Sequence, residues 1–214
     1  MLIGIAGKAR SGKDTFAEFL LKEFEPHGIR FIKAAFADAL KKLCMDSFGL
    51  TTEQLYGNQK EISDKRYRNH YISPINCGLG LTELPSGYWT PREIMQAVGS
   101  FYRSIDYDYW VKQLDKTVKV SELNNVIVTD IRHVNECRYI KDNDGLLIKV
   151  VREGTEVIHG MEHESETALD NYKQFDIEIF NNGDLADLNV AVRNIVKAII
   201  LLEEKIVKGE VYNG

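Results

Sequence analysis

The sequence has few cysteines, no long apolar run and no excess of positive charge. Its three cysteines, Cys44, Cys77 and Cys137, are scattered and form no C-x-x-C pair. This usage argues against a disulfide framework and predicts a reduced protein of the cytoplasm, or of the host cytoplasm if the source is viral. No apolar run approaches the length of a membrane span, and the run Leu2–Ala6 is too short for a signal peptide. We therefore expect no membrane partner.

The balance of charge narrows the classes of ligand. The net charge is -5 at pH 7, whereas general nucleic-acid binders usually carry a basic excess that meets phosphates. We therefore expect no nucleic acid as a partner. A small anionic substrate is compatible with this charge, because it needs only local positive charge.

Length and composition favour an ordinary globular fold. The chain has 214 residues, of which 44% are hydrophobic and 28% charged, so disorder is not expected. This length suits one α/β domain, or a domain with one sizeable insertion. The sequence leaves the oligomeric state open, including a homodimer.

Strand-like and helical stretches alternate along the chain. The expected strands are 2–6, 29–36, 125–130, 145–151 and 175–180, and the expected helices include 15–24, 37–48 and 185–206. Strands separated by helical crossovers predict an α/β fold with a parallel sheet that is covered on both faces. In such sheets, ligands bind beyond the carboxyl ends of the strands.

The segment 57–90 breaks this alternation. It contains Pro74, Pro85, several glycines and charges of both signs, without a sustained helical or strand period. We predict an inserted, lid-like segment over these residues.

A glycine-rich loop carries the first functional signal. Residues 7–15 read GKARSGKDT and lie between an expected strand and an expected amphipathic helix. In this G-x-x-x-x-G-K pattern, glycines let backbone N–H groups close around phosphates, and the helix N-terminus adds a positive end. The predicted ATP-binding residues of the loop are Gly7, Lys8, Ala9, Arg10, Ser11, Gly12, Lys13, Asp14 and Thr15. Lys13 is expected to act in catalysis by reaching the β and γ phosphates. The alternative is a plain turn with a helix cap.

The loop departs from the usual pattern at one position. Asp14 stands where a hydroxyl is common, and the hydroxyl comes one place later, at Thr15. Thr15 is expected to serve the metal or phosphate site, directly or through water. A carboxylate close to a triphosphate would be repelled by it unless Mg²⁺ lies nearby. Asp14 is therefore a second candidate for the metal site. The alternative for Asp14 is a helix-capping carboxylate.

Three further parts of the sequence resemble the phage-type deoxynucleoside monophosphate kinases. They are the segments 90–114 and 126–141, and the pair HESE (163–166) with IFNNGDLADL (179–188). The resemblance covers nearly the whole chain except 57–90. It implies a P-loop kinase fold with a five-stranded parallel sheet and helices on both faces. It also implies transfer of a phosphoryl group from ATP, with Mg²⁺, to a deoxynucleoside monophosphate, giving the diphosphate.

The resemblance selects an acceptor pocket on the helix that starts after Thr90. Arg92, Gln96, Gly99 and Arg103 recur at three- and four-residue spacing, so they share one helix face. Arginines suit a monophosphate, Gln96 can bind a base edge, and Gly99 would let a ligand approach the backbone. The alternative is a solvated helix face. Trp110 is a candidate for base stacking, against a role in the core.

Other candidates follow expected strands. Asp130 ends a strand near the loop, where a carboxylate can organise Mg²⁺ through water, or merely cap the strand. Arg132 is expected to hold the phosphate of either nucleotide, and Glu136 to bind substrate. Asp38 and Lys41 resemble the family's acceptor-side segment. Since an acceptor phosphate is already ionised at neutral pH, no general base is needed, and Asp38 would orient the acceptor or a metal-bound water.

The last candidates lie after the fourth and fifth strands. Arg152 begins a polar stretch that runs through 163–166, where the resemblance implies a lid over about 152–170. An arginine there can neutralise charge on the transferring phosphoryl group. Residues 181–183 (Asn181, Asn182 and Gly183) resemble the family's adenine-side loop, in which Asn182 and Gly183 are the expected ATP-binding residues, and the alternative is a turn with the cap of the last helix.

Two other functions stay open at this point. Another small-molecule P-loop kinase, such as one for dephospho-coenzyme A, has a similar loop. A nucleotide-binding switch would bind ATP or GTP without a small acceptor. Against a switch stand four arginines outside the loop, Arg92, Arg103, Arg132 and Arg152, which are more than one nucleotide needs.

Overall fold

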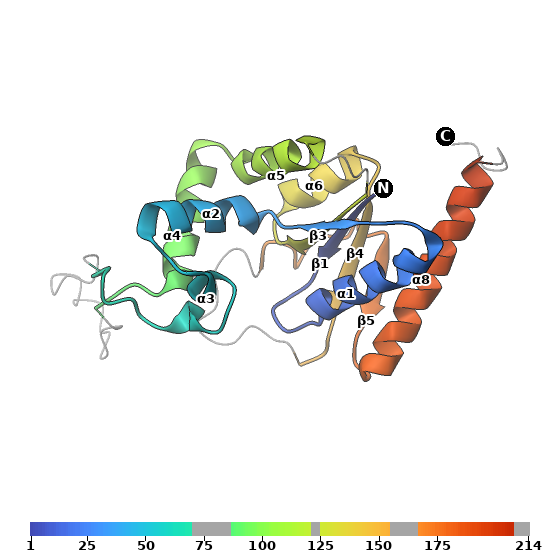
Figure 1. Cartoon of the computed structure of the whole chain (residues 1–214), viewed down its shortest axis with the longest axis horizontal. Helices are drawn as coiled ribbons and strands as arrows, with labels where there is room; N and C mark the ends of the chain where they lie inside the picture. Colours follow the sequence, from blue (N-terminus) through green and yellow to red (C-terminus); the bar gives the residue numbers. More distant parts are fainter. Residues whose placement is uncertain (70–86, 121–124, 155–166, 208–214) are drawn as a thin grey trace. The chain divides into compact units, whose positions relative to one another are not determined.

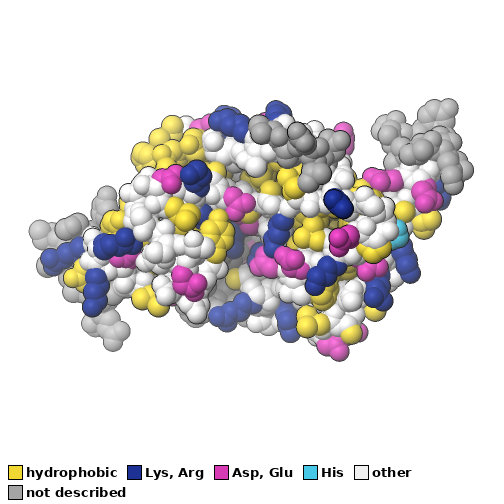
Figure 2. Space-filling model, in the orientation of Figure 1, with side chains coloured by type: hydrophobic (Ala, Val, Ile, Leu, Met, Phe, Trp, Pro, Cys, Tyr) yellow, Lys and Arg dark blue, Asp and Glu magenta, His cyan; other side chains and the backbone are white. Residues whose placement is uncertain are grey.

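A computed structural model describes residues 1–69, 87–120, 125–154 and 167–207 of the chain (Figure 1). The chain divides into two compact units. The first unit comprises Met1–Phe36 and Leu114–Gly214, and the second comprises Ala37–Gln113. Within the described ranges, no helix combines the length and the apolar character that crossing a membrane requires. On the face shown in Figure 2, positive and negative side chains are interspersed.

The first unit is built on a five-stranded parallel sheet. Its strands are β1 (Leu2–Ala6), β2 (Ile32–Ala34), β3 (Val126–Ile131), β4 (Leu146–Val151) and β5 (Ile177–Phe180), in the order β2-β3-β1-β4-β5. The predicted α/β fold with a five-stranded parallel sheet is therefore confirmed. The second strand is shorter than the predicted 29–36, because β2 lies at the sheet edge and only three of its residues pair with β3.

Helices cover both faces of this sheet, as predicted. The described helices that lie wholly in the first unit are α1 (Lys13–Phe24), the 3-10 turn η1 (Glu25–His27), α6 (Val134–Asp142) and α8 (Leu185–Val207). Helices α1 and α8 pack together on one face, and α6 packs on the other (Figure 1). Gly4 of β1 lets α6 approach, since a Cβ there would lie 2.8 Å from Cγ1 of Ile140.

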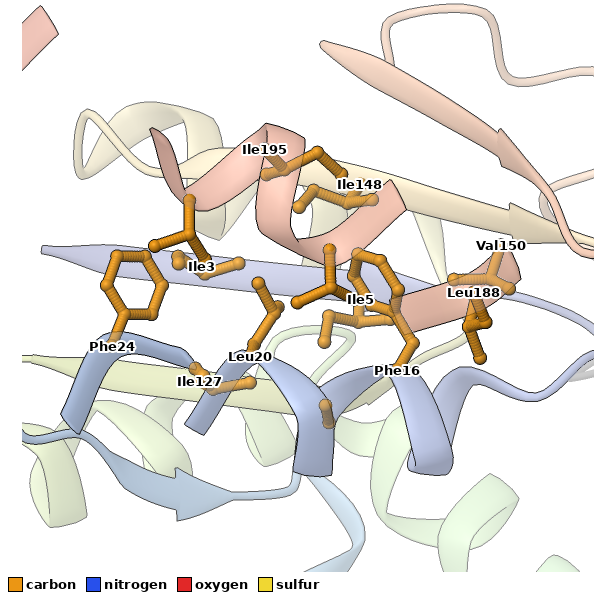
Figure 3. Close-up of a cluster of buried hydrophobic side chains, with 13 residues drawn as sticks. Ile3, Ile5, Phe16, Leu20, Phe24, Ile127, Ile148, Val150, Leu188 and Ile195 are labelled. Carbon is orange, nitrogen blue, oxygen red and sulfur yellow. The ribbon is translucent and has the colours of Figure 1, made fainter. Parts of the chain in front are cut away.

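The core between the sheet and α1 and α8 explains why these segments fold. Ile3 and Ile5 of β1 and Ile148 of β4 meet Phe16, Leu20 and Phe24 of α1 and Ile195 of α8 (Figure 3). The apolar residues of α1 recur every three or four positions, so one face is buried. This packing holds β1 and α1 rigidly and thereby positions the loop between them.

The second unit is helical. It contains α2 (Ala37–Phe48), α3 (Thr52–Leu55), the 3-10 turn η2 (Gln59–Glu61), α4 (Pro91–Ile105) and the start of α5 (Tyr109–Val120), which continues into the first unit. Helix α4 begins where the sequence predicts. The Thr90 hydroxyl accepts the N–H of Glu93, and the Glu93 carboxylate accepts the N–H of Thr90 at 2.7 Å. This reciprocal pair fixes the start of the helix.

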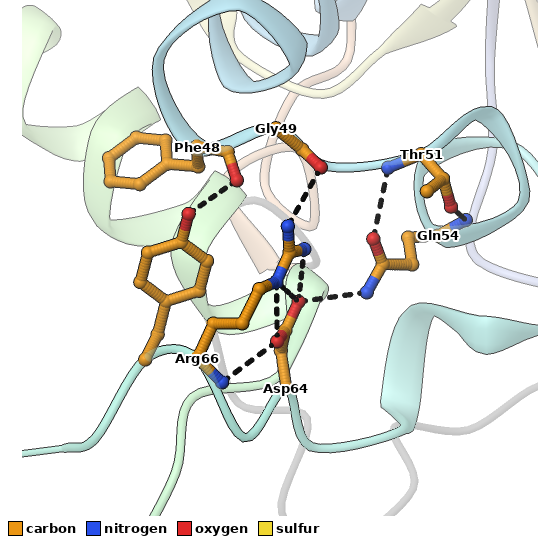
Figure 4. Close-up of polar contacts among 7 residues, drawn as sticks. Phe48, Gly49, Thr51, Gln54, Asp64 and Arg66 are labelled. Atoms are coloured by element: carbon orange, nitrogen blue, oxygen red, sulfur yellow. Dashed lines mark hydrogen bonds and ion pairs between the residues drawn. The ribbon is translucent and has the colours of Figure 1, made fainter.

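The predicted insertion 57–90 is described over 57–69 and 87–90, where a buried carboxylate organises it. Asp64 is 8% exposed and accepts hydrogen bonds from Arg66 Nη2 at 2.6 Å and from Gln54 Nε2 at 2.9 Å (Figure 4). Arg66 Nη1 also donates to the Gly49 carbonyl at 3.1 Å. The Arg66 guanidinium holds the pKa of the Asp64 carboxyl well below its usual range. A polar cluster, rather than a periodic apolar pattern, thus orders this part of the chain.

Candidate functional site

The glycine-rich loop connects β1 to α1 through a strongly curved backbone. Gly12 is the N-cap of α1 and has a φ of 92°, and Arg10 has a φ of 64°. The Ser11 N–H donates to the Lys8 carbonyl at 3.2 Å, which closes the turn. The first N–H groups of a helix have no partner within it, so the start of α1 presents donors to an anion.

Close packing inside the loop leaves room for glycine alone at two positions. A Cβ on Gly7 would lie 2.6 Å from both Ser11 Oγ and the Val150 carbonyl oxygen, and a Cβ on Gly12 would lie 2.3 Å from Nδ2 of Asn181. Ser11 is 1% exposed. Its hydroxyl has no hydrogen-bond partner among the described residues. Because buried hydroxyls are normally paired, this oxygen is a candidate to bind a phosphate of the predicted nucleotide.

Three loop residues belong to the first turn of α1. Lys13 begins the helix and is buried, Asp14 is exposed, and Thr15 is half-buried. Asp14 occupies the second helical position, whereas the N-cap is Gly12. The alternative of Asp14 as the N-cap residue is therefore wrong, although its charge still suits the positive end of the helix.

The loop after β5 ties the glycine-rich loop to the sheet through Asn181, which the sequence places in the expected adenine-side loop but does not single out as a binding residue. Asn181 is 7% exposed. Its Nδ2 donates to the Ser11 carbonyl at 2.9 Å, and its backbone N–H donates to the Val151 carbonyl at 2.7 Å. Its position directly after the last strand indicated the loop, but no signal in the sequence indicated the bond to Ser11.

The two neighbours selected from the sequence lie in the same turn. The Asn182 carboxamide oxygen accepts the N–H of Glu153 at 2.9 Å, which links the turn to the residues after β4. A Cβ on Gly183 would lie 2.2 Å from Oδ2 of Asp187. Asp184 caps α8, since its Oδ1 accepts the N–H of Asp187 at 3.0 Å. The alternative interpretation of this loop was a turn with the cap of the last helix, and the capping residue is Asp184.

The candidates near the end of β3 have different environments. Asp130 lies one residue before the end of β3, and its Oδ1 accepts the N–H of Phe36 at 2.7 Å. Arg132 is half-buried. Glu136 is buried, and its Oε2 accepts the N–H groups of Arg132 at 2.7 Å and His133 at 3.0 Å. This carboxylate thus satisfies N–H groups at the start of α6, and substrate binding by Glu136 stays a prediction.

Two cavities adjoin the glycine-rich loop. The larger, of about 480 Å³, is lined by Lys8, Ser11, residues 149–154 and Asp170. The smaller, of about 40 Å³, is lined by residues that include Gly7, Lys8, Arg132, Lys149 and Asp170. Lys8 Nζ pairs with Oδ1 of Asp170 at 3.1 Å, so this predicted ATP-binding lysine already has a carboxylate partner.

The predicted lid is described only at its two ends, because 155–166 lie outside the described residues. The stretch 163–166 therefore lies outside as well. Arg152 is exposed and lines the larger cavity. Among the described residues, no group of three or more His, Cys, Asp or Glu side chains is arranged to hold a metal. Mg²⁺ at phosphates commonly uses one or two protein carboxylates, with water and phosphate oxygens.

In the second unit, the predicted acceptor residues lie on α4. Arg92 Nε donates to the Glu61 carboxylate. Gln96 and Arg103 are half-buried, and Arg103 forms no ion pair within the described part of the chain. Arg103 is therefore the cation on this face that is best able to meet a phosphate.

Two other predicted acceptor residues, Gly99 and Trp110, are packed against neighbouring side chains. A Cβ on Gly99 would lie 3.3 Å from Cδ2 of Leu40 and 3.4 Å from Nη1 of Arg103. Trp110 is 3% exposed, and its indole N–H donates to the Gly99 carbonyl at 3.1 Å. These contacts favour a role of Trp110 in the core, which was the alternative, and a ligand at the Gly99 backbone stays a prediction.

Asp38 and Lys41 lie in the first turns of α2, near a tyrosine that the sequence reasoning missed. Lys41 Nζ lies 4.1 Å from the centre of the Tyr56 ring. Burial, with a contribution from the charge of Asp38, raises the pKa of Tyr56. No spacing in the sequence connects Tyr56 with these two residues.

The sheet order, the glycine-rich loop and the lysine at the start of α1 define the class of the protein by its fold, which is a P-loop fold of the kinase type. A family model described as deoxynucleotide monophosphate kinase matches residues 63–192. A putative deoxynucleotide monophosphate kinase of Acanthamoeba polyphaga mimivirus is 31% identical over 202 residues, which cover 87% of this chain and 91% of the relative. The deoxynucleotide monophosphate kinase of Escherichia phage RB69 is 26% identical over 245 residues, with 92% and 99% covered.

The chain belongs to the deoxynucleotide monophosphate kinase family. The predicted family, and the predicted kinase activity that it carries, are confirmed. Membership of a kinase family implies an enzyme that uses ATP and nucleotide substrates.

Proposed function

We propose that the chain transfers the γ-phosphoryl group of ATP to the 5'-phosphate of a deoxynucleoside monophosphate, with Mg²⁺. The observation that carries this proposal is the buried Ser11 hydroxyl without a hydrogen-bond partner, in the loop that leads to the buried Lys13 of α1, in a chain of this family. A small-molecule kinase of another kind, or a switch without an acceptor, would not account for the family match.

The donor residues lie in the first unit. Backbone N–H groups of 7–13 and the Ser11 hydroxyl hold the β and γ phosphates, and the Lys13 ammonium neutralises charge that develops on the bridging oxygen. Asn182 and Gly183 bound the adenine side. Asn181 holds the loop in this conformation through its bond to the Ser11 carbonyl.

Mg²⁺ is proposed at Thr15, Asp14 and Asp130, directly or through water. Bound there, the ion would neutralise the phosphate charges that Asp14 would otherwise repel. The exposed Asp14 carboxylate and the half-buried Thr15 hydroxyl have the hard oxygen ligands that Mg²⁺ prefers. Asp130 uses one carboxylate oxygen to accept the Phe36 N–H, which fixes the orientation of the group.

The acceptor residues lie in the second unit. Arg103 and Arg92 bind the monophosphate and Gln96 binds an edge of the base, while Asp38 and Lys41 orient the acceptor. An ionised oxygen of the acceptor attacks the γ-phosphorus, and the bond from that phosphorus to the β–γ bridging oxygen breaks, so that ADP leaves. No proton has to be removed from the acceptor oxygen. Arg132 and Arg152 then neutralise charge on the transferring group.

Further parts of the proposal concern organisation. The segment 57–90 serves the acceptor side, 152–170 forms the lid, and the whole chain acts as one kinase domain. The cytoplasmic location, which rests on cysteine usage, and a homodimer stay predictions.

Acceptor profiling tests the proposal. Release of ADP is measured in a coupled assay with each deoxy- and ribonucleoside monophosphate and with dephospho-coenzyme A. We expect ADP release with at least one deoxynucleoside monophosphate and dependence on Mg²⁺. ADP release with dephospho-coenzyme A alone would favour a dephospho-coenzyme A kinase. ATP hydrolysis that no acceptor stimulates would favour a nucleotide-binding switch.

A further inference from the structure

Lys149 is a lysine in an interior strand of the sheet, a position that parallel sheets normally fill with apolar residues. It lies on β4, which pairs with β1 on one side and β5 on the other, and it is level with Ala6 and Glu178. Its neighbours Ile148 and Val150 belong to the core beneath α1 and α8. Since side chains alternate along a strand, Lys149 points to the opposite face of the sheet.

The contacts of Lys149 within the protein are weak. Its Nζ lies 3.8 Å from Oε1 of Glu178, which is 42% exposed, and 5.0 Å from the centre of the Phe175 ring. A long ion pair with a solvated carboxylate contributes little, and a ring face attracts a cation only modestly. Its side chain is 26% exposed, so the ammonium is partly withdrawn from water without a close counter-charge.

Lys149 also lines both cavities beside the glycine-rich loop. Lys8 and Asp170 line both cavities as well, and they are paired with each other at 3.1 Å. Two lysines, Lys8 and Lys149, thus line both cavities. The nearest carboxylate that pairs with Lys149 among the described residues is that of Glu178, at 3.8 Å, which is more distant than the partner of Lys8. The larger cavity also contains Ser11, whose buried hydroxyl has no partner there.

We propose that Lys149 is a further phosphate-binding residue, whose ammonium contacts the polyphosphate of the nucleotide on the side of the loop formed by Lys8 and Ser11. The proposal rests on the proposed function only in that the loop binds ATP. A strand holds the base of the side chain in place, so little ordering is needed on binding. The ammonium and the Ser11 hydroxyl together supply a charge and a hydrogen bond that the backbone N–H groups alone do not.

The test is titration calorimetry of ATP, ADP and AMP binding to Lys149→Met, which keeps the unbranched shape of the side chain and removes its charged end. We expect the Kd for ATP to rise on the order of tenfold to a hundredfold, as for loss of a charge-assisted contact. The Kd for AMP should change less than about threefold, because a single phosphate offers less charge to meet. Lys149→Arg should restore most of the ATP affinity.

Two variants serve as controls. Lys33→Met removes a lysine from the edge strand β2, where its Nζ donates to Glu18 at 2.8 Å, and it should leave all three Kd values unchanged. Glu178→Gln removes the distant partner of Lys149, so ATP should bind as tightly as to the wild type, or more tightly. Melting temperatures are recorded for every variant, and Lys149→Gln replaces Lys149→Met if that protein does not fold.

Unchanged ATP affinity in Lys149→Met, an equal loss for AMP and ATP, or failure of Lys149→Arg to restore binding would each overturn the proposal. Wild-type turnover with deoxynucleoside monophosphates is measured in parallel. Failure of the proposed function would appear as a wild type without turnover, whereas failure of this inference would appear as an active wild type whose nucleotide affinity does not depend on Lys149.

Discussion

Asn181→Ala should loosen the nucleotide loop without touching any residue of that loop. The side chain donates to the buried Ser11 carbonyl at 2.9 Å and lies against Gly12. Alanine leaves that carbonyl without its donor, which costs about 1–3 kcal/mol of unfolding free energy. For a chain of this size, the melting temperature should fall by about 2–4 °C for each kcal/mol.

The same change should weaken ATP binding. The loop must be held in one conformation to bind phosphates. Each 1.4 kcal/mol by which the substitution destabilises this conformation should raise the KM for ATP about tenfold. Thermal unfolding measures the loss of stability, and steady-state kinetics at varied ATP concentration measures the rise in KM. Asn143→Ala is the matched control, since the Asn143 carboxamide donates to the Tyr139 carbonyl at an exposed position and loss of that bond should cost about 0.5 kcal/mol or less. If the two variants behave alike, Asn181 does not secure the loop.

Four further predictions concern single residues. Lys13→Ala should lower turnover by several orders of magnitude while the melting temperature stays near wild type, as kinetics and calorimetry would show. Asp130→Asn should weaken the response to Mg²⁺ more than metal-free nucleotide binding, and an unchanged response leaves Asp130 as a strand cap. Arg103→Ala should lower kcat/KM for the acceptor by an amount equivalent to on the order of 2–4 kcal/mol of activation free energy, and it should leave the KM for ATP unchanged. Equal losses for both substrates would show that Arg103 does not belong to the acceptor site. Because the pKa of Asp64 is lowered in the folded state, its stabilisation should be complete above the ordinary carboxyl pKa of about 4 and lost as pH falls below it. Unfolding titrations of wild type and Asp64→Asn would show whether this loss is absent from the variant.

The elements of the first unit were predictable because their pattern is local. Short apolar runs such as Leu2–Ala6 are buried strands, and the apolar positions of α1 recur at helical spacing. The end of β2 was not predictable from the run 29–36, because its length depends on how far β3 pairs with it. The start of α4 was predictable from Thr90 and Pro91, which act on adjacent backbone groups.

The candidate site was harder to predict where contacts are distant in sequence. Asn181 meets the Ser11 carbonyl across 170 positions, and no local pattern indicates such a bond. Spacing placed Gly99 on one face of α4 but could not indicate that Leu40 and Trp110 fill the space around it. Glu136 is a different case, since a glutamate at the third position of a helix is one half of the local capping-box pattern, although His133 stands where that pattern has Ser or Thr.

The central claim is transfer of the γ-phosphoryl group from ATP to a deoxynucleoside monophosphate, and direct detection of the product tests it most closely. ATP labelled in its γ-phosphate is incubated with the enzyme, Mg²⁺ and each deoxynucleoside monophosphate, with Lys13→Ala as the blank, and the products are separated. The account predicts label in a deoxynucleoside diphosphate and none with Lys13→Ala. Label that appears solely as inorganic phosphate, whichever acceptor is present, would contradict it.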